Sequence, residues 1–575
     1  MSSRKRSTLN RRDFLKGGTL AGAAFLATLV SRNNPSTLAA GEDVFSTFLP
    51  LIMQGTGGGG ASAPLEVIAL NRMAFGPRPG DIEAFRALGN SDEERLTAYV
   101  QQQLDPDSID DSEFETRYAA AGFQTLHKSL EELFADHIVN NPYDENDEAF
   151  WDWYSLPIYE LVDATILRAV YSRKQLSEVL ADFWFNHFNV YLWQDQGGPL
   201  GVSYDRDALR ANMFGNFRQM LEAVATHPTM LYYLNQNNSS DAGPNENYAR
   251  ELLELHTLGA ENYLGVQDPT TVEKDENGIA IGYVDNDVYE VARCLTGWRV
   301  DDDTVDGGNT GRFLYYKPWH DRFNKFVLGR YIPADQPDMK DGHDVLDLLA
   351  HHPGTARFIA RKLCRRFIAD DPPDSIVQAA ADTFLAYSDD PEQLKRVYET
   401  ILLSPEFAHA WGQKIKRPLE ATYAMLRALE ADFTRVPEAL PWVIYLMGQG
   451  LFSRRTPDGY PDTIPAWANT MSILYRWNLA LALTENWLNE ENGPTIHVDV
   501  RAQTPADLRT PAGLADFWIA RLLGRPLPDA SRQAVVDFIA RGEYGPDDEL
   551  PEEDFDYWLN GMVQVVLMAP EFSLR

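Results

Sequence analysis

Apolar residues beyond residue 65 recur mostly at steps of three and four, which is the period of an amphipathic α-helix. The clearest run covers residues 166–180. Residues that favour helix starts and ends stand at matching places. Ser91 precedes an acidic helix start, and Asn245 precedes a predicted helix over residues 246–258 that Gly259 ends. The pattern therefore predicts a chain dominated by helices.

Strand-like patterns are few. Residues 271–284 contain the turn sequence Asp275-Glu276-Asn277-Gly278, and residues 312–316 form a second short β-prone run. An Asn-Gly pair between such runs is typical of a hairpin. We therefore expect a mainly α fold, a large multi-helical body with small β-hairpin insertions.

The C-terminal half contains a candidate internal repeat. Residues 359–363 match residues 519–523, Pro373-Asp374 matches Pro528-Asp529, and the Pro-Glu-Phe at 405–407 matches the one at 570–572. These matches predict a duplicated helical unit over residues 356–407 and 515–572, with a sub-boundary near 340. The alternative is that short segments common in helices resemble each other by chance.

The first forty residues have the order of an export signal. Asn10-Arg11-Arg12-Asp13-Phe14-Leu15-Lys16 precedes an apolar run of 14 residues and then small residues near Ala39 and Ala40. The paired arginines resemble a twin-arginine signal. A transmembrane anchor is the alternative, but the run is shorter than the roughly 20 residues that a span needs. We expect a signal peptide over 1–40, a Gly/Ser-rich linker over 41–64, a helical domain over 65–575 and no transmembrane span after cleavage. The expected location is periplasmic, cell-envelope or extracellular.

Charge separates this N-terminal segment from the rest. The chain has 51 Lys and Arg against 85 Asp and Glu, a formal net charge of −34. The first forty residues contribute +6, so the remainder carries −40. Such an acidic body argues against nucleic acid or anionic lipid as a partner. The two cysteines, Cys294 and Cys364, lack metal-ligand spacing and are expected to be buried free thiols.

The densest group of candidate functional residues lies in the predicted helix over 246–258. Glu246, Arg250 and Glu254 fall on one helical stripe, and Glu251 lies on the adjacent one. Such a helix can present carboxylates and a guanidinium to one site, with Asn245 at its start. The alternative is an intrahelical ion-pair ladder capped by Asn245.

Two further places contain histidine. Asn186 and His187 end an aromatic-rich helix, and His320-Asp321 follows Trp298. His187, His320 and Asp321, together with Glu251, have the ligand types of a mononuclear metal site, so a divalent metal is a candidate cofactor. The alternative for each histidine is a hydrogen-bonded core residue.

Several short sequence motifs follow one another along the chain. They include Asn71-Arg72-Met73-Ala74-Phe75-Gly76, Phe183 to Val190, Asn245 to Gly259, Leu295-Thr296-Gly297-Trp298, His320-Asp321, Ala356 to Leu363, Gly448 to Phe452 and Trp467-Ala468-Asn469-Thr470. In these motifs and in their order, the chain resembles the bacterial "domain of unknown function 1800" family over nearly all of its length. The resemblance implies a predominantly helical and often exported protein. The activity of the family is not established, so the resemblance assigns no catalytic residue. Phe185 stands where the family often has His, and His256 where an aromatic residue is usual.

Two function classes remain open on the sequence. One is an exported hydrolase that acts on an envelope or extracellular polymer, with Glu251, Glu254 and His187 as catalytic groups and Asn186, Asn245, Glu246, Arg250 and Trp298 as binding residues. The other is a non-catalytic envelope protein that binds or assembles with other exported envelope proteins or a polymer. The sequence assigns no reaction.

Overall fold

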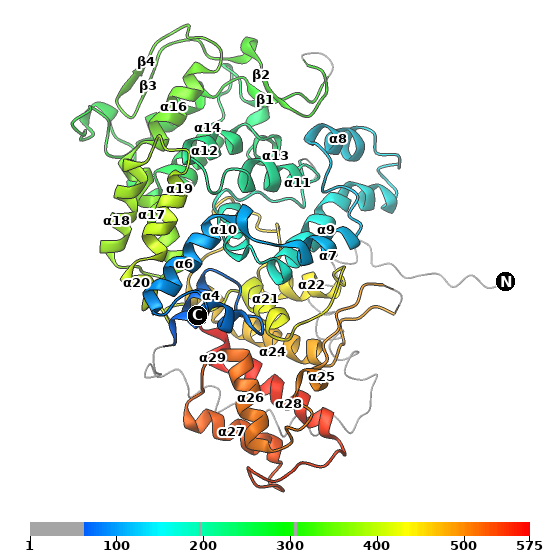
Figure 1. The fold of residues 1–575 in the computed structure, drawn as a ribbon. Coiled ribbons are helices and arrows are strands. Elements are labelled where there is room, and N and C mark those ends of the chain that lie inside the picture. Colours follow the sequence, from blue (N-terminus) through cyan, green and yellow to red (C-terminus); the bar gives the residue numbers. More distant parts are fainter. Residues whose placement is uncertain (1–62, 195–196, 304–306, 492) are drawn as a thin grey trace, which may run out of the picture.

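The computed structural model describes residues 63–194, 197–303, 307–491 and 493–575, and helices dominate these segments (Figure 1). The predicted signal peptide and nearly all of the predicted linker lie outside the described residues. The mainly α fold with small β-hairpins is confirmed. The first helices are α4 (Leu65–Arg72), α5 (Asp81–Arg86), α6 (Asp92–Leu104), α7 (Ser112–Ala120), α8 (Leu130–Phe134), α9 (Glu148–Tyr171) and α10 (Gln175–His187).

The middle of the chain mixes short α-helices with wider π-helical turns. The α-helices are α11 (Gly201–Ser203), α12 (Phe217–Ala225), α13 (Pro228–Tyr233), α14 (Glu246–Glu251) and α15 (Asp285–Cys294). The π-helical segments are η2 (Ala135–Val139), η3 (Tyr204–Arg210) and η5 (Leu252–Thr257), of which η5 directly continues α14. Short 3₁₀ turns are η1 (Pro106–Ser108), η4 (Gln236–Asn238), η6 (Ala260–Asn262), η7 (Pro269–Thr271) and η8 (Lys317–Trp319).

Two small antiparallel sheets follow. Strand β1 (Trp298–Val300) pairs with β2 (Phe313–Tyr315), and β3 (Lys325–Val327) pairs with β4 (Arg330–Ile332). The predicted β-prone run at 312–316 is strand β2. The predicted hairpin over 271–284 has its turn, because the Gly278 amide donates to the Asp275 carbonyl at 3.0 Å. Its two arms pair through one antiparallel bridge between Lys274 and Ala280, and the Ile281 amide donates to the Glu273 carbonyl at 3.0 Å. The amides of Ala280 and Tyr283 donate to other segments, at Leu328 and Asn262.

The remaining helices complete the body. They are α16 (Lys340–Ala350), α17 (Pro353–Phe367), α18 (Asp374–Ala386), α19 (Gln393–Leu402), α20 (Pro405–Ala408), α21 (Pro418–Ala428), α22 (Ala439–Leu446), α23 (Ile464–Trp467), α24 (Thr470–Thr484), α25 (Val500–Gln503), α26 (Pro511–Leu523), α27 (Asp529–Ala540), α28 (Phe555–Met568) and α29 (Pro570–Ser573). Strands β1 to β4 lie at one end of the molecule and α25 to α28 at the other, with α4, α10 and α21 between them (Figure 1).

The two halves of the predicted repeat have the same order of elements. In each, three helices pack on one another and a short helix that begins with proline follows: α17 to α20 and α26 to α29. The second helix of each unit carries the same internal bond. Gln378 donates to Asp382 at 2.7 Å, and Gln533 donates to Asp537 at 2.8 Å. These matches agree with a duplication, which stays a prediction together with its boundaries.

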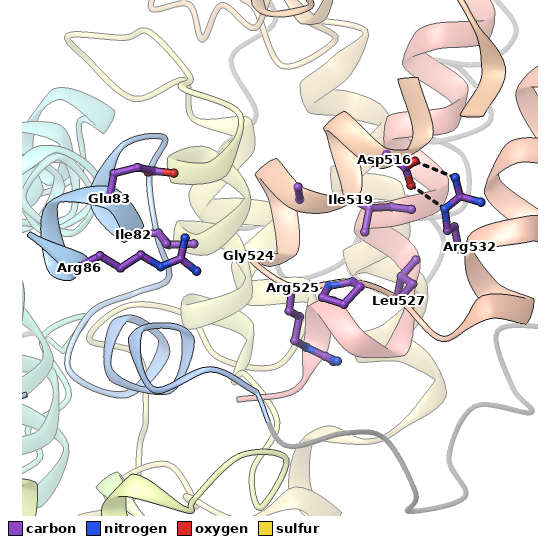
Figure 2. Close-up of a pocket in the computed structure, with 11 residues that line it drawn as sticks. Ile82, Glu83, Arg86, Asp516, Ile519, Gly524, Arg525, Leu527 and Arg532 are labelled. Carbon is purple, nitrogen blue, oxygen red and sulfur yellow. Dashed lines mark hydrogen bonds and ion pairs between the residues drawn. The ribbon is translucent and has the colours of Figure 1, made fainter. Parts of the chain in front are cut away.

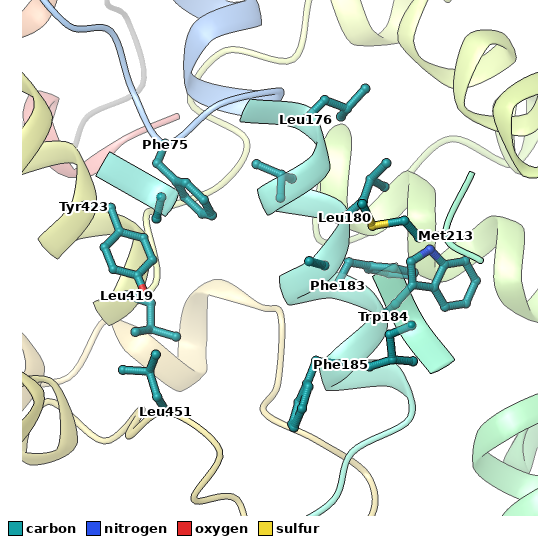
Figure 3. Packing of buried hydrophobic residues seen from close by; sticks show 14 of the residues in the cluster. Phe75, Leu176, Leu180, Phe183, Trp184, Phe185, Met213, Leu419, Tyr423 and Leu451 are labelled. Atoms are coloured by element: carbon teal, nitrogen blue, oxygen red, sulfur yellow. The ribbon is translucent and has the colours of Figure 1, made fainter. Parts of the chain in front are cut away.

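Helix α10 passes through the hydrophobic core (Figure 3). Its Trp184 is fully buried, and the indole Nε1 donates to the Tyr398 hydroxyl of α19 at 2.7 Å. Tyr423 of α21 meets Phe75 edge to face, with ring centroids 5.0 Å apart. This packing holds the C-terminal end of α10, where the candidate residues Asn186 and His187 lie.

Both cysteines are buried and free, as expected. Among the helices of the described segments, none has the length and apolar character that crossing a bilayer requires.

Candidate functional site

The end of α10 holds a loop that comes from far along the chain. The Asn186 side chain donates to the Tyr460 carbonyl at 2.9 Å and accepts from the Tyr460 amide at 2.7 Å. Asn189 donates to the carbonyls of Arg454 and Thr456. Gly459 fits between them with φ +72°, and a Cβ there would lie 2.2 Å from the Asn186 carbonyl oxygen. Asn186, predicted as a binding residue, thus positions the loop over residues 454–460.

His187 is buried beside this loop, with 1% of its surface exposed. Its Nε2 lies 3.2 Å from the His256 carbonyl oxygen, which can only accept a hydrogen bond, so Nε2 carries the proton. Its Nδ1 then accepts from the Lys362 Nζ at 2.8 Å. Burial, followed by the charge of Lys362, holds the pKa of His187 well below its ordinary value. His187 is therefore a neutral imidazole whose Nδ1 lone pair accepts a hydrogen bond from Lys362.

Lys362 is a residue that the sequence analysis missed as a site residue. It is half-buried on α17, and burial lowers the pKa of its ammonium to about 8, with help from Arg365 and against the charges of Asp458 and Glu261. The sequence nevertheless contains an indication that Lys362 is a site residue. Lys362 falls three residues after the buried Ile359 on α17, and the matching position in the second repeat unit is Leu522, which is 3% exposed. A lysine at a position suited to leucine indicates a role other than packing.

The predicted helix over 246–258 forms as α14 and η5, and Asn245 caps it as predicted. The Asn245 side chain accepts from the amides of Asn247 and Tyr248 and donates to the Leu234 carbonyl. The ion pair of Arg250 is with Asp285 of α15, at 3.3 Å, instead of along its own helix. The wider π turn of η5 rotates Glu254 away from the α-helical stripe, and Glu246 is exposed.

Glu251 and Glu254 are half-buried on this helix, and the charge of Asp458 in the loop over 454–460 acts on Glu251. Burial raises the pKa of Glu251 to about 7, and the charges of Glu254 and Asp458 add to this effect while Arg250 opposes it. No hydrogen-bond donor contacts the Glu251 carboxyl within the described part of the chain. Because Asp458 acts on both Glu251 and Lys362, the four charged groups form one electrostatic cluster beside His187. We call His187, Glu251, Glu254, Lys362 and Asp458 the junction cluster.

His320 and Asp321 belong to a second cluster. Asp321 accepts from Arg293 at 2.7 and 3.1 Å, and its amide donates to Thr296. His320 lies between the Thr296 carbonyl and Asp341, at 3.0 and 3.3 Å. Lys325 is fully buried and lies 2.5 Å from Asp341 Oδ2.

The structure does not assemble the predicted metal set of His187, His320 and Asp321. No hydrogen bond, ion pair or ring contact between described residues joins the two clusters. Within residues 63–575, as far as they are described, no group of three or more His, Cys, Asp or Glu side chains is placed to hold a metal ion. At Asp321 the guanidinium of Arg293 and the ammonium of Lys325 already supply the positive charge that a metal would bring.

Trp298, predicted as a binding residue, is a core residue of the second cluster. Its ring is fully buried against Phe313 and His343. Gly342 of α16 gives it room, since a Cβ there would lie 2.3 Å from the ring.

A groove of about 360 Å³ lies elsewhere, between α5 and the end of α26 (Figure 2). Its polar lining includes Glu83, Arg86, Arg525 and the Asp516–Arg532 ion pair. No member of the junction cluster lines it. The junction cluster is the candidate site because its charged groups act on one another, whereas in the groove Asp516 and Arg532 neutralise each other and Arg86 pairs with Glu66.

The fold and the site define a mainly α protein in which α10, α14 with η5, α17 and a returning loop contribute the residues of a small acid–base cluster. The chain belongs to the DUF1800 family, described as "Protein of unknown function", whose model matches residues 68–574. No curated protein and no solved structure matches the chain.

Proposed function

We propose that the protein is an exported hydrolase that acts on an envelope or extracellular polymer, with its acid–base site at the junction cluster. The observation that carries the proposal is the contact of 2.8 Å between Lys362 Nζ and the neutral His187, together with a half-buried Glu251 that lacks a donor in the described structure and shares with Lys362 the charge of Asp458. A carboxyl group and an amine whose pKa values burial shifts toward neutral pH are typical of catalytic sites.

The chemistry assigns a role to each group. A carboxyl group whose pKa is about 7 can both accept and donate a proton near neutral pH, so Glu251 is the general base that activates water. The Lys362 ammonium stabilises the negative charge that develops on the attacked group. His187 positions Lys362, and Glu254 raises the proton affinity of Glu251.

Export through the twin-arginine route is part of the same proposal. That route carries folded proteins, and both cysteines here are free and buried, so folding needs no oxidising compartment. Replacing Arg11 and Arg12 together by lysine is expected to leave the full-length protein in the cytoplasm of its host. Export of that variant at the wild-type level would contradict this part of the proposal.

A non-catalytic envelope protein is the second candidate, and one observation favours it. Asn186, Asn245, Arg250 and Trp298, all predicted as binding residues, instead cap, pair and pack within the described structure. Such a protein would bind a polymer or an envelope partner without cleaving it.

The test compares purified mature protein with Glu251→Gln on a bacterial cell-wall fraction and on secreted polysaccharide, with release of new chain ends as the measurement. General base catalysis contributes on the order of 10²–10⁴ in rate, and we expect that loss in Glu251→Gln. The matched control is Glu273→Gln, an exposed glutamate outside the junction cluster. Wild-type protein that sediments with the polymer without cleaving it would support the second candidate. Equal rates for wild type and Glu251→Gln would overturn the proposed site.

A further inference from the structure

Seven basic side chains are buried together near the centre of the molecule, where α4, α17, α21 and α24 meet the end of the chain. Each is at most 5% exposed. They are Arg72, Arg366, Lys414, Lys416, Arg417, Arg476 and Arg575. We call them the basic cluster.

Four carboxylates face the basic cluster among the described residues. Glu420 receives Arg366, Arg417 and Arg575, the last at 3.0 Å. Asp182 pairs with Arg417 and Arg366, while Asp370 and Asp462 pair with Lys414 at 2.9 and 3.0 Å. The main-chain carboxylate of Arg575, the last residue of the sequence, is a fifth anion, so seven cations against five anions leave an excess of two positive charges inside a protein whose overall charge is −34. Buried charges are normally paired, so this excess is costly as it stands.

Unmatched donors occur on five arginines of the basic cluster, and they include Nε and Nη2 of Arg366 and Nε of Arg417. Nε and Nη1 of Arg72, Nε and Nη2 of Arg476, and Nε and Nη2 of Arg575 are buried without a hydrogen-bond acceptor in the part of the chain that the structure describes. The other nitrogen of Arg72, Nη2, donates to the Ala410 carbonyl at 2.5 Å and to the main-chain oxygen of Arg575, the last residue, at 2.9 Å. Lys416 donates to the Phe572 and Leu574 carbonyls and lies 4.9 Å from the centroid of the Phe572 ring. Among the described residues, no side-chain carboxylate therefore pairs with Arg72, Arg476 or Lys416.

The electrostatics agree with an excess of positive charge. Burial, and then the charge of Arg575, lowers the pKa of Lys416 to about 7. Burial also lowers the pKa values of Arg476 and Arg575 to about 10. In each case the cost of burying the cation outweighs the opposing effect of the negative charge of Glu420.

We propose that the basic cluster binds an oxyanion of the phosphate class, held by Arg72, Lys416, Arg476 and Arg575. Guanidinium groups match the geometry of phosphate oxygens, and donors that come from α4, α24 and two further segments suit a ligand with several oxygens. Arg525 connects the cluster to the surface, because it lines the groove of Figure 2 and its charge acts on Lys416. This site shares no side chain with the junction cluster and does not depend on the proposed function.

The experiment is calorimetric titration of the dialysed mature protein with inorganic phosphate, at constant ionic strength in chloride. We expect one phosphate per chain. A hydrogen bond to a charged group contributes about 1.5–3 kcal/mol, so Arg476→Met should weaken binding by roughly ten- to a hundredfold. Arg476 suits this test because its replacement leaves no carboxylate without its partner. The matched control is Arg357→Met, a partly exposed arginine of α17 that pairs with Asp374 and should leave binding unchanged.

Further arms separate the sources of the ligand and cover failure to fold. If phenyl phosphate binds as tightly as inorganic phosphate, the ligand is a phosphate monoester. If phenyl phosphate does not bind while inorganic phosphate does, the ligand is the free ion. If the titration gives no heat, the protein is denatured and the released phosphate is measured. One phosphate released per chain would show that the site was already occupied and would support the proposal. If Arg476→Met does not fold, Lys416→Met takes its place. Absence of both heat and retained phosphate, or equal affinity in the folded variant, overturns the proposal.

Discussion

Lys362 directs its Nζ at Nδ1 of His187 from a distance of 2.8 Å, although the two residues are 175 positions apart in the chain. The contact is possible because His187 gives its own proton to the His256 carbonyl and so offers a lone pair to the lysine. It joins α17 to α10 at the point where the loop over 454–460 is held by Asn186 and Asn189. The relationship makes Lys362 the residue whose properties are most informative about the site.

The first prediction concerns the pH dependence of stability that Lys362 brings. The pKa of Lys362 is about 8 in the folded protein against an ordinary 10.5, so between these values the unfolded chain binds a proton that the folded one lacks. Stability due to this residue therefore rises with pH across that window. The free energy of unfolding of wild type relative to Lys362→Met should increase by about 2 kcal/mol from pH 8 to pH 10.5 in urea titrations.

The control for this prediction is Lys317→Met, since Lys317 is an exposed lysine that pairs with Asp338 at 2.7 Å. Its difference from wild type should not change over the same window. A flat difference for Lys362→Met would mean that the lysine is not held in its desolvated position.

The contribution of Glu251 to stability is predicted to change with pH in the opposite direction. Its pKa is raised from 4.5 to about 7, so the folded protein holds a proton that the unfolded chain has lost, and stability falls as pH rises between these values. Glu251→Gln removes the cost of the charge. We expect the variant to match wild type near pH 4.5 and to be more stable by about 2 kcal/mol at pH 8. Thermal unfolding at the two pH values measures this, and Glu273→Gln should show no such trend.

Gly342 is predicted to tolerate no side chain. A Cβ at this position would lie 2.3 Å from the fully buried ring of Trp298, which has no room to move. Gly342→Ala should destabilise the protein by about 1–3 kcal/mol, as measured by the urea midpoint. Gly243→Ala is the comparison, because nothing lies within 4 Å of the added Cβ and φ is not positive there. Equal midpoints for the two variants would contradict the packing of α16 on Trp298.

Glu420 is predicted to be among the residues most important for stability. It is 3% exposed, and Arg366, Arg417 and Arg575 hold its pKa well below the ordinary value in spite of its burial. Glu420→Gln leaves these guanidinium groups without their shared partner and should cost about 3–5 kcal/mol, or prevent accumulation of folded protein. Glu222→Gln, which breaks the partly exposed pair with Arg218, should cost less than about 1 kcal/mol in the same unfolding assay.

Local chemistry was enough to predict much of the fold. The helix start at Ser91, the cap at Asn245 and the end at Gly259 all depend on interactions within four residues, and all three occur in the structure. The hairpin over 271–284 has its predicted turn and a short pairing of its two arms at Lys274 and Ala280, while the contacts of its second arm with Leu328 and Asn262 are not local and were not predicted. Strands β1, β3 and β4 are three residues long, too short to leave a recognisable period.

The sequence by itself determined a helical protein of one family, with an N-terminal export pattern, and it located Glu251, Glu254 and His187 as residues to consider together. These inferences need only the period of apolar residues and short motifs. Only the tertiary structure decided that Lys362 and Asp458 join them, and that His320, Asp321 and Trp298 lie in another cluster. The reason is physical: the pKa values of Glu251 and Lys362 depend on burial and on the charge of Asp458, which lies 207 positions from Glu251 and 96 from Lys362, and spacing along the chain contains no record of either.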